Sequence, residues 1–163
     1  MVEYGWIIVA TVLGAVLAAA YFARPLWQNR RRHRLIQARK DFHFQRERLE
    51  CVFFQLASQS GKPRGLRWVD CDFEDGVTYA RDRQSGELSA LVGVTIRFEA
   101  IEGGPMEDNP NVGRQRAATA VFRFNGRMWE TSGRAIFNLN PSEAIEHFRD
   151  SLVMIGQEMA ARA

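Results

Sequence analysis

The most constraining feature is an uncharged apolar stretch near the start of the chain, residues 4–23, YGWIIVATVLGAVLAAAYFA. At the rise of an α-helix, about twenty residues cover about 30 Å, the thickness of a bilayer's hydrocarbon core. A segment inside lipid must be helical, because no water is present to satisfy its backbone groups. Rings that prefer the headgroup level stand near both ends, at Tyr4, Trp6, Tyr21, Phe22 and Trp27. The sequence therefore predicts a transmembrane anchor over residues 1–27.

A basic segment follows the anchor directly, with seven Arg and Lys residues and no acidic residue in residues 24–40. Arginines beside a span remain on the cytoplasmic side of the membrane, and each attracts anionic headgroups by about 1 kcal/mol. We expect residues 28–40 to form a basic helical stalk, with the N-terminus outside and the following domain in the cytoplasm. The residues expected to contact the membrane interface are Arg24, Trp27, Arg30, Arg31, Arg32, Arg34, Arg39 and Lys40.

A cleaved signal peptide is the alternative interpretation of the same stretch, since Ala18-Ala19-Ala20 resembles a cleavage site. A signal peptide has positive charge before its apolar run, however, whereas this chain has Glu3 and no basic residue there. The sequence favours an uncleaved single-pass anchor. Its small residues Ala10, Gly14 and Ala18 share one helix face and predict a homodimer contact, although such residues are also common in spans generally.

The folded part of the chain is mildly acidic once the basic stalk is set aside, although the whole chain carries 22 Lys and Arg against 19 Asp and Glu. Nucleic acid is therefore not an expected partner, because the positive charge adjoins lipid rather than the folded domain. The expected partners are the bilayer, its anionic headgroups and a protein. Cys51 and Cys71 are too few for a disulfide scaffold and fit a reducing compartment.

Residues 41–163 are predicted to form one soluble α+β domain. A helix to about residue 59 carries an apolar stripe, and a final helix starts at Asn140-Pro141 and is expected to continue to Met159. Between them, alternation of apolar and polar residues predicts strands near 66–73, 77–82, 88–99, 118–124 and 129–137. We expect a four- to five-stranded antiparallel sheet with the helices packed on one face in two layers.

The clearest turn is Asn125-Gly126, a dipeptide typical of two-residue hairpin loops. Such a loop would place Phe124 opposite Arg127 and Phe122 opposite Trp129. The sequence therefore predicts an aromatic cross-strand pair on the buried face.

No residue pattern predicts catalytic chemistry, and we expect no catalytic residue, no cofactor and no metal. The acidic run from Asp70 to Gly76 departs from a calcium loop, because the glycine comes one position late and Arg81 stands where the closing glutamate belongs. The three histidines lack carboxylate or cysteine partners nearby in the sequence. Both cysteines are expected to be small core residues rather than nucleophiles.

A long loop over residues 101–115 is the remaining candidate, because loops of this length are often binding segments, although plain disorder explains others. Its candidate contact residues are Glu102, Gly103, Gly104, Pro105, Met106, Glu107, Asp108, Asn109 and Pro110. The expected function is a non-enzymatic protein-interaction or scaffold module. The alternative is a small-ligand or enzymatic pocket between the sheet and its helices, lined by Phe98, Phe122, Phe124, Trp129 and Phe137.

Overall fold

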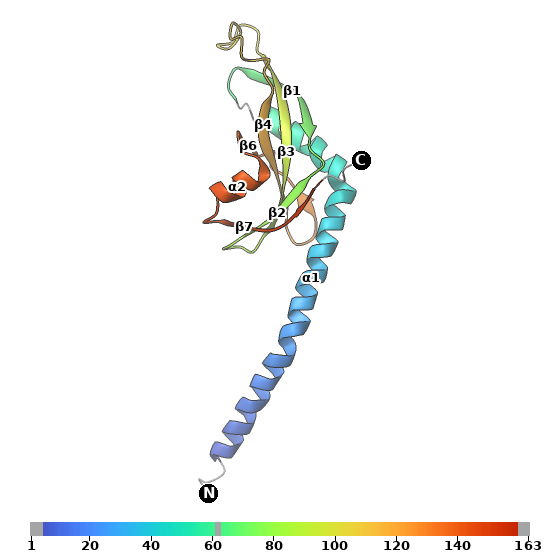
Figure 1. Ribbon diagram of the computed structural model, residues 1–163, viewed down its shortest axis with the longest axis vertical. Helices are drawn as coiled ribbons and strands as arrows, with labels where there is room; N and C mark the ends of the chain where they lie inside the picture. Colours follow the sequence, from blue (N-terminus) through green and yellow to red (C-terminus); the bar gives the residue numbers. More distant parts are fainter. Residues whose placement is uncertain (1–4, 61–62, 160–163) are drawn as a thin grey trace. The chain divides into compact units, whose positions relative to one another are not determined.

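The structure, a computed structural model, describes residues 5–60 and 63–159; along the first helix it describes the side chains of residues 9–15, 21 and 32 onward. The chain divides into two compact units, Met1–Lys40 and Asp41–Ala163. Helix α1, Gly5–Gln59, belongs in part to each unit (Figure 1). In the portion of the chain covered by these ranges, no helix meets the length and apolarity that crossing a membrane requires.

In the described part of the chain, seven strands form one antiparallel sheet, which confirms the α+β class and exceeds the predicted four to five strands (Figure 1). The elements after α1 are β1 (Leu66–Phe73), β2 (Val77–Asp82), β3 (Leu88–Ala100), β4 (Arg116–Phe124), β5 (Trp129–Glu130), β6 (Ala135–Phe137), α2 (Pro141–His147) and β7 (Leu152–Glu158). The strand order is β5-β4-β3-β2-β7, while β1 pairs with β3 and β6 pairs with β4. The long strand β3 lies at the centre and determines the register of its neighbours.

The predicted final helix is wrong beyond its first two turns. Asn140 and Glu143 form the expected capping box, with the Asn140 Oδ1 accepting from the Glu143 N–H at 2.9 Å, but α2 ends at His147. Residues 152–158 instead form β7, which pairs antiparallel with β2. A short apolar run is compatible with a helix and with a strand. Here the edge of β2 that β3 does not occupy offers backbone hydrogen bonds, and these favour the strand.

Helices α1 and α2 pack on opposite faces of the sheet, which corrects the expected two-layer arrangement. Phe42 of α1 contacts the Phe122 ring at 5.4 Å between centroids, so α1 covers the face of Phe122. Val121 precedes Phe122 and pairs with Leu91 of β3, so both point to the other face of the sheet. There Leu91 packs with Ala144 and Ile145 of α2. Leu91 is the single large apolar residue on the face of β3 that the alternation pattern predicts to be solvated. The packing of α2 on this face explains why an aliphatic residue stands there.

The hairpin between β4 and β5 has a different register from the predicted one. The structure pairs Phe124 with Trp129, and the Asn125 N–H donates to the Met128 carbonyl at 3.2 Å, so the loop contains four residues. Asn125 accounts for this, because its Oδ1 accepts the N–H groups of Arg127 and Met128, both at 3.0 Å. The shift is two residues, and since side chains alternate with a period of two, Trp129 stays on the buried face.

The predicted strand over residues 129–137 is interrupted at Gly133. Its φ of 71° lies in the left-handed region that favours glycine, and a Cβ at this position would lie 2.5 Å from the backbone nitrogen of Ala57. Glycine therefore lets this segment pass close beneath the last turn of α1. The strand divides into β5 and β6, with Arg134 between them.

Candidate functional site

The aromatic face that the sequence suggested as a pocket lining is a filled core. Phe98, Phe122 and Trp129 are at most 2% exposed. Phe42 and Phe53 of α1 cover them, with ring centroids 5.0 Å apart for Phe42 and Trp129 and 5.9 Å apart for Phe53 and Phe122. Phe124 and Phe137 are half-buried at its margin. This face stabilises the domain and leaves the opposite face of the sheet for a ligand.

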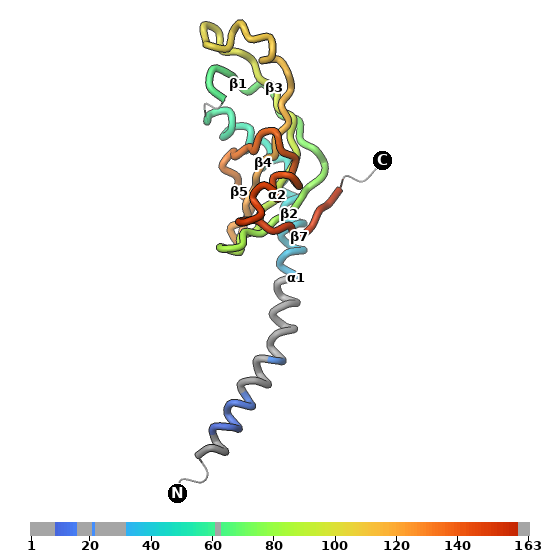
Figure 2. Tube along the Cα trace, turned by 60° about the vertical axis from the view of Figure 1, so that its left-hand side comes forward, coloured from blue at the N-terminus to red at the C-terminus, as the bar shows by residue number. Residues whose placement is uncertain are grey.

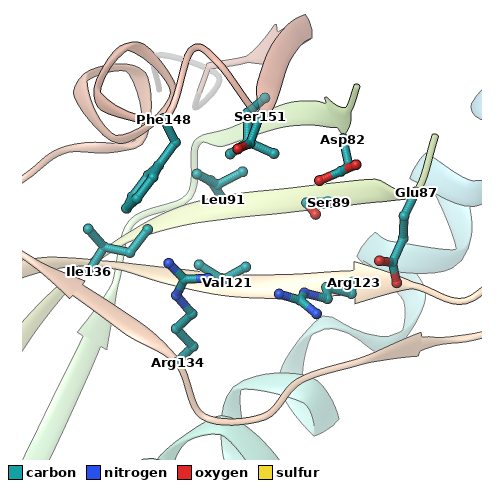
Figure 3. A pocket seen from close by; sticks show the side chains of 11 residues that line it. Asp82, Glu87, Ser89, Leu91, Val121, Arg123, Arg134, Ile136, Phe148 and Ser151 are labelled. Atoms are coloured by element: carbon teal, nitrogen blue, oxygen red, sulfur yellow. The ribbon is translucent and has the colours of Figure 1, made fainter. Parts of the chain in front are cut away.

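A pocket of about 340 Å³ lies on that opposite face, beside α2, and we call it the α2-side pocket (Figure 3). Its floor comes from β3 and β4, and its walls come from the β2–β3 turn, from β6 with the residue before it, and from the segment between α2 and β7. The lining residues are Asp82, Glu87, Ser89, Leu91, Val121, Arg123, Arg134, Ile136, Phe148, Ser151 and Leu152. Its volume is at the lower end of the range for small-molecule sites, about 300–1,000 Å³.

Strand register explains why these residues converge. Ser89 pairs with Arg123, Leu91 pairs with Val121, and the Val121 N–H donates to the Arg134 carbonyl at 3.1 Å. Directly opposed residues of an antiparallel pair share a face, and so do residues two apart along one strand. The polar residues that alternation predicts to face solvent on β3 and β4 therefore become the floor of a pocket once α2 and β7 are in place.

Two guanidinium groups form one side of the pocket. Figure 3 shows the side chains of Arg123 and Arg134 converging across Val121. The Arg134 guanidinium carbon lies over the Phe148 ring, 5.4 Å from its centroid, in a cation–π contact. Among the residues that the structure describes, no carboxylate forms an ion pair with either arginine. This side can therefore receive a planar anion.

Two carboxylates, Asp82 and Glu87, stand at the other side of the pocket, on either side of the turn between β2 and β3 (Figure 3). The turn is closed by the Asp82 N–H, which donates to the Glu87 carbonyl at 2.9 Å. Backbone donation from Ser85 and from Gln84 to the Asp82 Oδ1 lowers the pKa of that carboxyl, and the charge of Arg123 acts in the same direction. Asp82 is therefore ionised at neutral pH.

A second, more open groove of about 480 Å³ lies between α1 and β1 and brings the two cysteines into one lining. Cys51 is exposed and Cys71 is half-buried, so the prediction that both are core residues is wrong for Cys51. Burial, followed by the charge of Asp70, raises the pKa of the Cys71 thiol to about 12. Cys71 therefore remains a protonated thiol at neutral pH and is a poor nucleophile.

The histidines include one contact that sequence reasoning missed. The His43 Nε2 lies 2.6 Å from the Glu158 Oε2, and the Tyr79 hydroxyl donates to the same oxygen at 3.2 Å. His43 and Glu158 are 115 positions apart, so no local spacing could reveal the pair. It joins α1 to β7. In the described ranges, no three His, Cys, Asp or Glu residues are grouped as metal ligands.

The predicted membrane-interface residues are described only in part. Arg32, Arg34 and Lys40 are exposed and Arg39 is half-buried, whereas the side chains of Arg24, Trp27, Arg30 and Arg31 lie outside the described residues. For the predicted dimer contact, Ala10 and Gly14 are exposed, and the side chain of Ala18 lies outside the described residues. The structure leaves both predictions untested.

The loop over residues 101–115 is a succession of hydrogen-bonded turns. The Gly103 N–H donates to the Glu107 Oε2 at 2.8 Å, and the Asn111 N–H donates to the Asn109 Oδ1 at 3.0 Å. The loop lies at the far end of the sheet from α2 and β7 (Figure 2), and it contributes no residue to the α2-side pocket. Its predicted role in binding is therefore separate from the pocket.

Comparisons with protein-family models, with curated proteins and with solved structures give no match for this chain.

Proposed function

We propose that this chain is a single-pass membrane protein that presents its α+β domain in the cytoplasm as a non-enzymatic interaction module. The carrying observation is that Val9, Val12 and Leu13 of α1 are 67%, 57% and 60% exposed. Three aliphatic side chains exposed on one helix, in a stretch without charge, have a favourable environment in lipid. The basic residues after the stretch support anionic lipid contact and a cytoplasmic domain.

We expect a reporter enzyme that is active only outside the cytoplasm to be inactive when fused to Ala163. The reason is the difference between the seven basic residues in residues 24–40 and the lone Glu3 before the anchor. The same chain should remain in the membrane fraction after alkaline extraction. Replacing Arg30, Arg31, Arg32 and Arg34 with glutamine is the control, and it should raise reporter activity. Strong activity of the unaltered fusion would reverse the topology, and release by alkali would remove the anchor.

A small-ligand role is the second candidate function, and the α2-side pocket specifically favours it. The pocket is built on the central strands of the sheet, and its far wall is fixed by backbone contacts. The Arg83 N–H donates to the Ser151 carbonyl at 2.8 Å, and the Ser151 N–H donates to the Phe148 carbonyl at 2.9 Å. A site whose lining is held in place by the fold costs less entropy to occupy.

We expect small fragments to bind the full chain in detergent micelles and to lose their saturation-transfer NMR signal when Ser89 is replaced by tryptophan. Ser89 is on the floor of the pocket and is only 7% exposed, so an indole at this position should fill the space. Ser58→Trp, on the last turns of α1 and outside the pocket lining, is the matched control. If no fragment depends on Ser89, the pocket has no small-ligand role.

A further inference from the structure

The charged side chains of the α2-side pocket are spread along its length. Arg134 lies with Phe148 and Ile136 at one end, Asp82 and Glu87 lie at the other end, and Arg123 lies between them (Figure 3). Across the described residues, neither acid has a Lys or Arg nitrogen within 4.0 Å, although acids elsewhere on the surface form such pairs, for example Asp70 with Arg97 at 3.0 Å. The pocket therefore has Arg134 at one end and two carboxylates at the other, with the charge of Arg123 between them.

The end with Arg134 is arranged to hold a planar anion. The Phe148 ring covers one side of the Arg134 guanidinium. A guanidinium presents a planar fork of N–H donors, which matches a carboxylate or phosphate. Arg123 contributes a second positive charge, but it lies opposite Glu130 in the strand register and its charge also acts on the Asp82 carboxylate. Arg134 is thus the main anion-binding group.

The middle of the pocket is apolar with two hydroxyl groups. Leu91, Val121 and Ile136 supply aliphatic surface between the charged ends, while Ser89 and Ser151 offer hydroxyl groups at its floor and wall. A ligand with a single charge would place its own apolar part against the charged side chains at the other end of the pocket and leave them without a partner. A ligand with a short aliphatic spacer between opposite charges would match the ends and the middle together.

We infer that the α2-side pocket binds a small zwitterion, with its anionic group at Arg134 and its ammonium group at Asp82 and Glu87. This inference rests on the small-ligand role proposed above and adds the chemical class. The same pair of charges occurs in free amino acids and in the ethanolamine phosphate headgroup of lipids. The shared chemistry is an oxyanion and a primary ammonium group joined by a few carbon atoms.

Ligand-observed NMR titrations of the full chain in detergent micelles test this class with four probes. The zwitterions δ-aminovalerate and phosphoethanolamine carry both charges, while valerate and pentylamine carry one each. At least one zwitterion should bind about tenfold more tightly than either single-charge probe, which corresponds to one additional charged contact. Preference for δ-aminovalerate would indicate a free amino acid, and preference for phosphoethanolamine would indicate a headgroup.

Two variants assign the ends of the ligand. Arg134→Gln should lower zwitterion affinity to that of pentylamine, and Arg134→Lys should retain part of it. Glu87→Gln should lower zwitterion affinity to that of valerate. Glu87 is substituted instead of Asp82 because the Asp82 carboxylate also accepts two backbone N–H groups of its turn. Arg127→Gln, on the exposed β4–β5 loop, should change nothing. Equal affinities for valerate and the zwitterions, or unchanged selectivity in Glu87→Gln, would overturn the zwitterion class. Fragment binding that depends on Ser89 would still support a small-ligand role in that case.

Discussion

Phe42→Ala is expected to destabilise the folded unit by about 3–5 kcal/mol, the usual cost of removing a buried aromatic side chain. Phe42 is 0% exposed, and its ring contacts those of Tyr79, Phe122 and Trp129 at centroid distances of 6.2, 5.4 and 5.0 Å. A loss of this size is a large fraction of the roughly 5–15 kcal/mol that stabilises a domain. Urea unfolding of the full chain in micelles, followed by near-ultraviolet circular dichroism, measures it.

Phe44→Ala is the matched control, because it removes the same side chain two positions further along α1. Phe44 is 93% exposed, so its removal should cost less than about 0.5 kcal/mol. The comparison tests whether residues after Lys40 are part of the domain core, as the division of the chain at this point suggests. Equal costs for the two substitutions would contradict the placement of α1 on the sheet.

Trp129→Ala should also cost about 3–5 kcal/mol, although β5 contains only two residues. The indole is 1% exposed and lies between the rings of Phe42 and Phe124, at centroid distances of 5.0 and 5.3 Å. Its removal would leave a cavity between α1 and the β4–β5 hairpin. The expected result is a chain that is unfolded or melts at a much lower temperature, measured by thermal unfolding with the same optical signal.

Met128→Ala tests the register of this hairpin. Met128 is 47% exposed and precedes Trp129 directly, so its truncation should cost on the order of 0.5 kcal/mol or less. A slip of one residue would exchange the two faces and make Met128 the buried side chain. A costly Met128 and an inexpensive Trp129 would therefore refute the observed pairing of Phe124 with Trp129.

Local sequence patterns predicted the elements that are formed by short-range interactions. The apolar stripe containing Phe42 and Phe53 predicted the helix that covers the sheet, and both residues are buried. Alternation predicted β1 to β4, and Asn140 with Glu143 predicted the start of α2. These features depend on periodicity and on side-chain contacts a few residues apart, so they can be read along the chain.

The pocket could not be predicted in the same way, because its residues come from four separated segments. Ser89 and Arg123 looked like solvated positions of two strands, and Arg134 and Phe148 had no visible relation to them. Leu91 was the one available indication, since an aliphatic residue on a predicted polar face suggests that something covers that face. The identity of the covering element depended on α2 and β7, and β7 itself was predicted as helix.

The sequence by itself determined the uncharged stretch of residues 4–23, the basic segment after it, the α+β class and the face of β3 and β4 that packs against α1. It determined the face of Trp129 even where the register was wrong, since a shift of two residues preserves side-chain direction. Only the tertiary structure decided that α2 packs opposite α1, that residues 152–158 complete the sheet beside β2, and that Arg134 and Glu87 face one pocket. Those outcomes depend on strand pairing and on burial between segments that are far apart in the sequence. The free energy of such contacts leaves no trace in the local periodicity of the chain.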